Sequence, residues 1–177
     1  MAATAALTTV TLDEYLHTTY EPDADFVDGH LEERNLGEID HSELQAVIGF
    51  LLRGHQKDWN VRVYPEVRVQ VGPNRFRVPD ITVVAGGRPR TRIVREAPLL
   101  CIEILSPEDR WLRVQQRFQD YLRMGVREVW VFDPETRTAY VLRNDAAPAE
   151  HREDMLVLAG TPIALSLPEV FGVLDEE

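Results

Sequence analysis

The chain has 177 residues, which is about the length of one domain. Apolar residues make up 44% and charged residues 28%, a globular balance that excludes a disordered or fibrous protein. No apolar run reaches the roughly 20 residues that a membrane-spanning helix needs. The single cysteine, Cys101, excludes an internal disulfide and four-cysteine zinc sites. We therefore expect a single domain over 1–177, located in the cytoplasm and without a membrane partner.

The charge balance is acidic, with 19 basic and 30 acidic residues and a net charge of −11. This argues against a protein that coats nucleic acid through bulk positive charge, because phosphate contacts supply non-specific affinity. A local basic strip or a metal-bridged phosphate stays compatible with it. Lys57 is the only lysine, so a mechanism that needs a lysine has one position available.

Two helix starts and a hairpin are predicted in the first third of the chain. Thr11–Glu14 reads as a capping box that opens a short helix. Asp28-Gly29 between apolar residues is a strong signal for a β-hairpin. Asp40–Glu43 is a second capping pattern, which predicts another helix. That helix has an apolar stripe at spacings of three and four: Leu44, Val47, Ile48, Leu51 and Leu52.

Alternating valines indicate a strand over 67–71, and a second strand follows after a turn. A three-residue loop would pair Val69 with Arg77 and mix polar and apolar faces, whereas a four-residue loop pairs Val69 with Val78. Because a one-residue slip exchanges the two faces, we predict the second register. It places Asp80 on the same face as the valines, an unusual position for a carboxylate.

Pro98–Leu105 is a nearly unbroken apolar run, as expected of a central strand that is covered on both faces. Ser106-Pro107 then predicts a helix start, and Gly125 predicts the end of that helix near Met124. This order of elements predicts an α/β or α+β domain around one central sheet. The remaining predicted elements are a hairpin of strands over 128–133 and 138–143, a weak strand over 155–158 and a short helix near 168–171.

Glu103 lies at the centre of that apolar strand. An ionised carboxylate there costs several kcal/mol unless it is paired or binds a metal; the alternative is an exposed strand end or a buried arginine partner. Asp80 follows Pro79, a pair that is also common as turn punctuation. Neighbouring strands lie about 4.8 Å apart. Carboxylates on adjacent strands of one face can therefore share a hard divalent cation such as Mg²⁺.

The helix after Glu103 supplies further candidates. At about 100° per residue, Gln115 falls within its apolar stripe and Arg117 lies on the flank, so we expect both to point toward the sheet. The alternatives are a core amide and a surface arginine that extends its head into water. His41, in the first turn of the second predicted helix, is either a functional residue or a cap. No zinc spacing, phosphate-binding glycine loop or G-x-S-x-G elbow occurs.

Three segments, Val78–Val84, Cys101–Pro107 and Tyr121–Pro134, resemble the Uma2 family, also called DUF820. These are bacterial proteins with the PD-(D/E)XK fold. The likeness covers a core of about 11–143. It implies an α/β restriction-endonuclease-like fold: a central mixed β-sheet flanked by helices, with an N-terminal helix and β-hairpin. A C-terminal strand and short helix over 155–172 would complete the single domain.

The resemblance assigns Pro79-Asp80 to the family's PD and Glu103 to its second acid. These acids would hold Mg²⁺ or Mn²⁺, with the Ile104 carbonyl as a further ligand. The metal would lower the pKa of a bound water and stabilise charge on the scissile phosphate. Glu66 matches an acid often seen there, although the predicted register turns it away unless Pro65 introduces a bulge. Carboxylates more than about 8 Å apart, or each held by its own arginine, would contradict a shared ion.

One departure concerns the motif lysine, whose position two residues after the second acid holds Leu105. In Uma2 proteins the lysine is usually on the following helix, where an ungapped match puts Arg117. Arginine can hold a phosphate but exchanges protons poorly, and Gln115 could orient water. We predict a Mg²⁺- or Mn²⁺-dependent endonuclease acting on DNA, with His41 and Glu66 supporting. The alternatives are a binding or interaction module without catalysis, or another chemistry; a homodimer is also predicted as an option.

Overall fold

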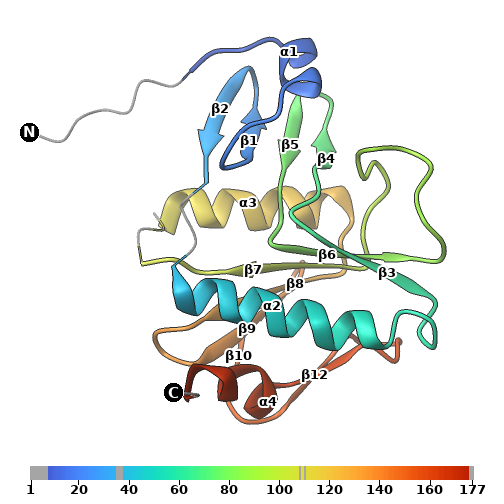
Figure 1. Ribbon diagram of the computed structural model, residues 1–177, viewed down its shortest axis with the longest axis vertical. Coiled ribbons are helices and arrows are strands. Elements are labelled where there is room, and N and C mark those ends of the chain that lie inside the picture. Colours follow the sequence, from blue (N-terminus) through green and yellow to red (C-terminus); the bar gives the residue numbers. More distant parts are fainter. Residues whose placement is uncertain (1–7, 35–37, 108, 110, 176–177) are drawn as a thin grey trace, which may run out of the picture.

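The computed structural model describes residues 8–34, 38–107, 109 and 111–175. A large mixed sheet forms its centre, with helices on both faces and a smaller antiparallel sheet beyond one helix (Figure 1). The large sheet has the strand order β10 (Ala149–His151), β9 (Thr138–Leu142), β8 (Glu128–Asp133), β7 (Leu100–Ile104), β6 (Ile81–Ala85) and β3 (Val61–Pro65). The small sheet has the order β2 (His30–Glu33), β1 (Ala24–Val27), β5 (Arg75–Arg77) and β4 (Val69–Gly72).

The helices are distributed over the two faces of the large sheet (Figure 1). Buried side chains of α3 pack on one face, and those of α2 and α4 pack on the other. A short two-stranded sheet lies next to α4 in the chain. The bounds are α1 (Leu12–His17), α2 (Ile39–Gly54), α3 (Trp111–Met124), α4 (Leu167–Gly172), the 3₁₀ helix η1 (Val173–Asp175), β11 (Met155–Val157) and β12 (Ala164–Ser166).

The predicted N-terminal helix and hairpin are confirmed. The Thr11 hydroxyl accepts the backbone N–H of Glu14, whose carboxylate accepts the backbone N–H of Thr11, so the capping box is complete. The hairpin pairs Val27 with His30. Its two turn residues, Asp28 and Gly29, have φ of 49° and 91°, the left-handed backbone that an Asp-Gly turn supplies.

Two predicted helix starts are wrong. Helix α2 begins at Ile39 after Glu38, whose side chain makes no capping hydrogen bond, so the pattern at Asp40–Glu43 lies inside the helix. Helix α3 begins at Trp111, after a turn in which the Ser106 N–H donates to the Asp109 carboxylate at 2.8 Å. Among the described residues, the Ser106 backbone, and not its hydroxyl, therefore makes the contacts of this turn. The predicted end of α3 is confirmed, since Gly125 follows with φ of 105°.

The predicted register between β4 and β5 is also wrong. Val69 pairs with Arg77, and the register shifts by a β-bulge between Gln70 and Gly72. The apolar pattern assumed that Arg77 faces water, but Arg77 is fully buried. Three carboxylates compensate its burial. Arg77 Nη1 lies 2.9 Å from Asp25 and 2.7 Å from Glu32, and Nη2 lies 2.8 Å from Asp120.

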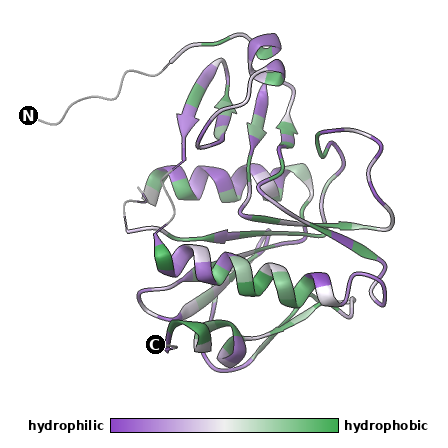
Figure 2. Ribbon diagram, viewed as in Figure 1, coloured by the Kyte–Doolittle hydropathy of each residue, from purple (hydrophilic) through white to green (hydrophobic). Residues whose placement is uncertain are grey.

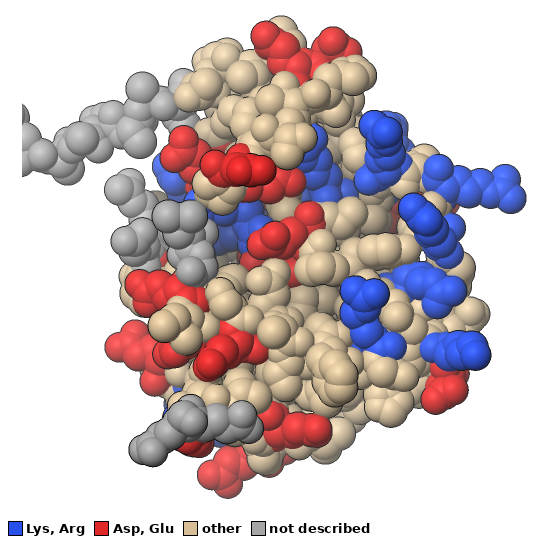
Figure 3. Space-filling model, in the orientation of Figure 1, with Lys and Arg blue, Asp and Glu red and all other residues tan. Residues whose placement is uncertain are grey.

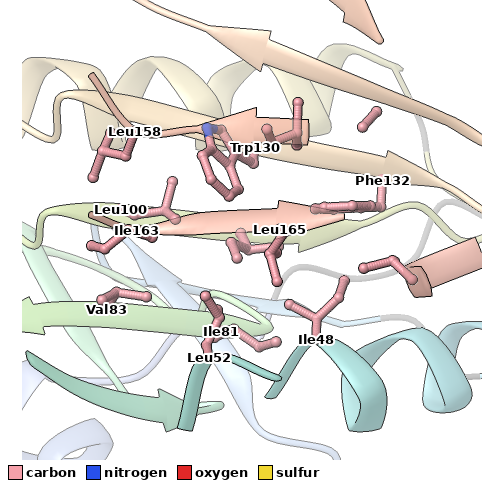
Figure 4. Close-up of a cluster of buried hydrophobic side chains, with 14 of the residues drawn as sticks. Ile48, Leu52, Ile81, Val83, Leu100, Trp130, Phe132, Leu158, Ile163 and Leu165 are labelled. Carbon is pink, nitrogen blue, oxygen red and sulfur yellow. The ribbon is translucent and has the colours of Figure 1, made fainter. Parts of the chain in front are cut away.

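Strand β7 is the central element that positions the site. It pairs antiparallel with β6 and parallel with β8, and α3 forms the crossover between the two parallel strands. Figure 4 shows Leu52 of α2 beside Ile81 of β6, in the same cluster as Ile48 of α2, Leu100 of β7 and Trp130 of β8. Each of the larger helices carries both hydrophobic and hydrophilic residues (Figure 2). Within the described residues, no helix is both long and apolar enough to span a membrane.

Candidate active site

Asp80 and Glu103 are brought together by the pairing of β6 with β7. Ile81 pairs with Ile102, so the antiparallel register places the preceding Asp80 opposite Glu103. The backbone N–H of Ile104 donates to Asp80 Oδ2 at 2.7 Å. Both carboxylates are buried, with 1% and 2% of the residue exposed. Residues more than 20 positions apart in the chain therefore lie side by side in the protein interior.

Each carboxylate is held by its own arginine. Arg34 donates to Asp80 Oδ1, and Arg117 Nη1 donates to Glu103 Oε2 at 3.1 Å. The Tyr121 hydroxyl donates to the other Glu103 oxygen at 2.6 Å. This is one of the two arrangements that we expected to contradict a shared ion. Among the described residues, no group of three or more His, Cys, Asp or Glu side chains is placed to hold a metal.

The two acids have pKa values shifted in opposite directions. Burial raises the pKa of Glu103 to about 7; Arg117 opposes that shift, and the charge of Asp80 adds to it. Burial also acts to raise the pKa of Asp80, but the charge of Arg34 and the contact with His41 outweigh it and hold that pKa at about 2. Two interacting carboxyls with separated pKa values are typical of sites that assign one acid and one base.

His41 and Glu66 lie beside Asp80. His41 Nε2 is 3.4 Å from Asp80 Oδ2, while His41 Nδ1 is buried with no hydrogen-bond partner among the described residues. Burial acts to lower the pKa of His41. The hydrogen bond and the charge of Asp80 outweigh burial, so the net shift of this pKa is upward. Glu66 was predicted to turn away. Its left-handed backbone, with φ of 46°, places its carboxylate 3.8 Å from Arg34 and lets its N–H donate to the Asp80 carbonyl.

Gln115 does not lie in this pocket. It is exposed and lines a cavity of about 660 Å³ together with Arg75 and Arg123. The prediction that its side chain points toward the sheet is therefore wrong. The apolar stripe of α3 has two flanks, and only the flank of Arg117 and Tyr121 faces Glu103, because residues four apart share one face of a helix.

Sequence reasoning missed three residues that contact the acids. Arg34 holds Asp80 from the end of β2, and Gln45 Nε2 donates to the Asp80 carbonyl at 3.1 Å. Tyr121 was recognised only as part of an apolar stripe. Its spacing of four from Arg117 was a usable signal, since it places both polar groups on one helix face. Arg34 gave no local signal, because its partner lies 46 positions away.

The donor set fits a hard divalent cation in its chemistry. Mg²⁺ prefers oxygen ligands, and Asp80 and Glu103 supply carboxylate oxygens. In an extended strand the N–H and C=O of one residue point to the same side. Since the Ile104 N–H is directed at Asp80, its carbonyl faces the same pocket. An ion bound there would compete with Arg34 and Arg117 for these oxygens.

Comparisons with known proteins agree with this architecture. The sequence model of a family described as "Uma2: Putative restriction endonuclease" matches residues 12–170. A crystal structure of a "putative nuclease belonging to DUF820" from Anabaena variabilis ATCC 29413 superposes with a TM-score of 0.81 at 24% identity, over 93% of this chain and 99% of that chain. A DrdV–DNA complex gives a TM-score of only 0.40 at 13% identity, over 74% of this chain and 10% of that one. No curated protein matches the chain.

Proposed function

This chain belongs to the Uma2 family, and on that premise we propose that it is a metal-dependent endonuclease that hydrolyses phosphodiester bonds in DNA. The observation that carries the proposal is the buried pair of Asp80 and Glu103, which lie on adjoining strands with pKa values shifted apart. The family's restriction-endonuclease-like description supports the same reaction class. The fold of the DUF820 structure matches 93% of this chain.

Asp80, Glu103 and the Ile104 carbonyl would hold Mg²⁺ or Mn²⁺. The bound ion would lower the pKa of a water and neutralise charge that builds on the phosphate. Arg117 stays charged at working pH, so it can hold a phosphate oxygen but cannot exchange a proton. Glu103, with a pKa of about 7 in the metal-free protein, would lose its proton on binding the ion, so metal affinity would rise with pH. Arg34 and His41 would support Asp80.

A second candidate is a nuclease-fold module that binds nucleic acid without cleaving it. The observation that favours it is the pairing of Arg34 with Asp80 and of Arg117 with Glu103. Two buried ion pairs neutralise the charge that would otherwise attract a cation. Breaking either one leaves an uncompensated buried charge, which costs on the order of 3–5 kcal/mol. Metal binding has to offset that cost in the endonuclease proposal.

A cleavage panel separates the two candidates. Supercoiled plasmid, single-stranded DNA and RNA are incubated with Mg²⁺, Mn²⁺ or EDTA, using the native protein, a D80N/E103Q variant and a D145N/E169Q control on exposed acids. We expect metal-dependent nicking of plasmid by the native protein and the control only. No cleavage by any protein, or equal cleavage by the D80N/E103Q variant, would contradict the endonuclease. Binding without cleavage would support the module.

Self-association is a separate part of the proposal, in which two copies enclose the DNA in a shared cleft. Sedimentation velocity of the native chain tests it directly. A species of twice the chain mass of 20.2 kDa would support the dimer. A single species of one chain mass at micromolar concentration would contradict it.

A further inference from the structure

Six exposed basic side chains gather at one end of the large sheet. Two come from the end of α2 and the turn after it, and four come from the loop that joins β6 to β7. These segments are neighbours, because Val61 of β3 pairs with Ala85 of β6 and the Gly86 N–H donates to the Asn60 carbonyl at 2.7 Å. We call this set the basic face: Arg53, Lys57, Arg88, Arg90, Arg92 and Arg95.

Among the charged side chains in the rest of the same view (Figure 3), acidic ones outnumber basic ones. Figure 3 shows blue side chains over the end of α2, β3 and the loop at the right, whereas red side chains predominate at the left. The whole chain carries a net charge of −11, so the excess of acids is concentrated away from the basic face. A positive region on a strongly acidic protein steers a polyanion to one place instead of coating the whole surface.

The basic face has no partner within the described part of the chain. None of its six side chains forms an ion pair there, although Asp58 and Glu96 lie in the same segments. Elsewhere, exposed Arg137 and Arg152 pair with carboxylates, whereas exposed Arg113 has no ion pair among the described residues. Guanidinium groups without internal partners are available for phosphate oxygens, which they bind with charge-assisted hydrogen bonds.

A groove leads from Arg53 of the basic face toward the backbone of Asp80. A cavity of about 340 Å³ lies between α2 and β3, with Gln45 and Glu66 at one end and Arg53 at the other. Gln45 donates to the Asp80 carbonyl, so the groove begins beside the site. Strand β6 runs along the same path from Ile81 to Ala85. At 3.2–3.4 Å per residue this is roughly 17 Å, the length of about five base steps of a DNA strand.

We propose that the basic face docks the phosphate backbone of duplex DNA, and that one strand continues along the α2–β3 groove to the Asp80–Glu103 pocket. This inference rests on the proposed function, because it supplies the binding path for the same substrate. Contacts with phosphates position a duplex without reading its sequence. If all six side chains contact phosphates, the slope of log affinity against log salt would be on the order of −5.

Binding measured without metal tests the docking surface separately from hydrolysis. A fluorescent DNA duplex is titrated in EDTA with the native protein, an R88Q/R90Q/R92Q loop variant and an R113Q/R137Q/R152Q control. The control removes the same charge from other exposed positions. We expect the loop variant to bind at least ten-fold more weakly at low salt, with a slope shallower by about three. The control should stay within two-fold of the native protein.

Several outcomes would overturn the docking surface. These are equal affinity of the loop variant and the native protein, equal loss in both variants, or binding of phosphatidylserine vesicles without binding of DNA. Plasmid cleavage gives the second readout. Unimpaired cleavage by the loop variant would leave hydrolysis standing and reject the docking surface. If only the loop variant loses DNA binding in EDTA, and no protein cleaves the plasmid, the docking surface is retained and hydrolysis is rejected.

Discussion

Two buried ionic clusters lie in this protein, and they differ in how completely their polar atoms are satisfied. In the first, Arg77 is fully buried and contacts Asp25, Glu32 and Asp120. In the second, around Asp80 and Glu103, two polar atoms are buried with no hydrogen-bond partner among the described residues. Those atoms are Arg34 Nε and His41 Nδ1.

The difference supports the proposal that the Arg77 cluster is structural and the Asp80 cluster functional. The Arg77 cluster joins β5 of the small sheet to Asp120 of α3, and each of its charges is matched by a close partner. The Asp80 cluster retains unused hydrogen-bonding capacity and an acid with a pKa of about 7. Unsatisfied buried polar atoms beside an acid with a perturbed pKa are consistent with the proposed ligand site.

The largest effect on stability is expected at Arg77. An Arg77→Met variant leaves the buried Asp25 and Asp120 without their main partner, so we expect a loss of about 3–5 kcal/mol in the free energy of unfolding. Urea denaturation measures it. Arg117→Met should cost less, because Glu103 can take up a proton when its partner is removed. A larger loss for Arg117→Met would reverse the comparison between the clusters.

Glu103→Gln is expected to separate activity from stability. A glutamine resembles the protonated acid, which is a substantial part of the population near neutral pH because burial raises the pKa of Glu103 to about 7. We therefore expect little change in the urea midpoint at pH 7. Metal-dependent nicking should fall by about 10²-fold or more, because metal catalysis contributes several kcal/mol to the barrier. A large fall in the urea midpoint with nicking retained would assign Glu103 a purely structural role.

The stability of the metal-free protein should fall as pH rises from 5 to 8. The folded pKa of Glu103, about 7, lies above its ordinary value of 4.5. The folded state therefore binds this proton more tightly, and the stabilisation is lost as pH passes through the folded pKa. His41, with its raised pKa, acts in the same direction. Thermal melts in EDTA measure the fall, and Glu103→Gln should reduce it. A melting temperature that rises over this range would contradict the raised pKa.

The smallest effect on nicking is expected at Tyr121. Its hydroxyl donates to Glu103 at 2.6 Å and lowers the pKa of that acid. Tyr121→Phe removes one buried hydrogen bond to a charged group, worth about 1.5–3 kcal/mol, but protonation of Glu103 offsets part of this loss. We expect the pH midpoint of nicking to move upward. An unchanged midpoint would show that the hydroxyl does not act on Glu103.

Local patterns in the sequence were enough to predict several of these features. The capping box at Thr11, the Asp28-Gly29 turn and the buried strand around Glu103 depend on neighbouring residues, and the structure confirms each of them. Asp80 and Arg117 were also predicted to lie near Glu103, and both do. Features of this kind need only short-range propensity and periodicity.

What the sequence could not predict depends on distant partners. Arg77 was assumed to face water, and the register of β4 with β5 failed for that reason. The carboxylates that permit its burial lie 43 to 52 positions away in the chain. Arg34 was missed for the same cause. Gln115 was misplaced because periodicity defines a helical stripe but does not show which of its flanks faces the site.

Titration calorimetry with Mn²⁺ tests most directly whether Asp80 and Glu103 share one ion. The native protein is compared with the D80N/E103Q variant and with the D145N/E169Q control under identical conditions. We predict that one Mn²⁺ binds per chain in the native protein and the control, and that the binding heat disappears in D80N/E103Q. Equal heats in all three proteins, or no binding to the native protein, would contradict the shared metal site.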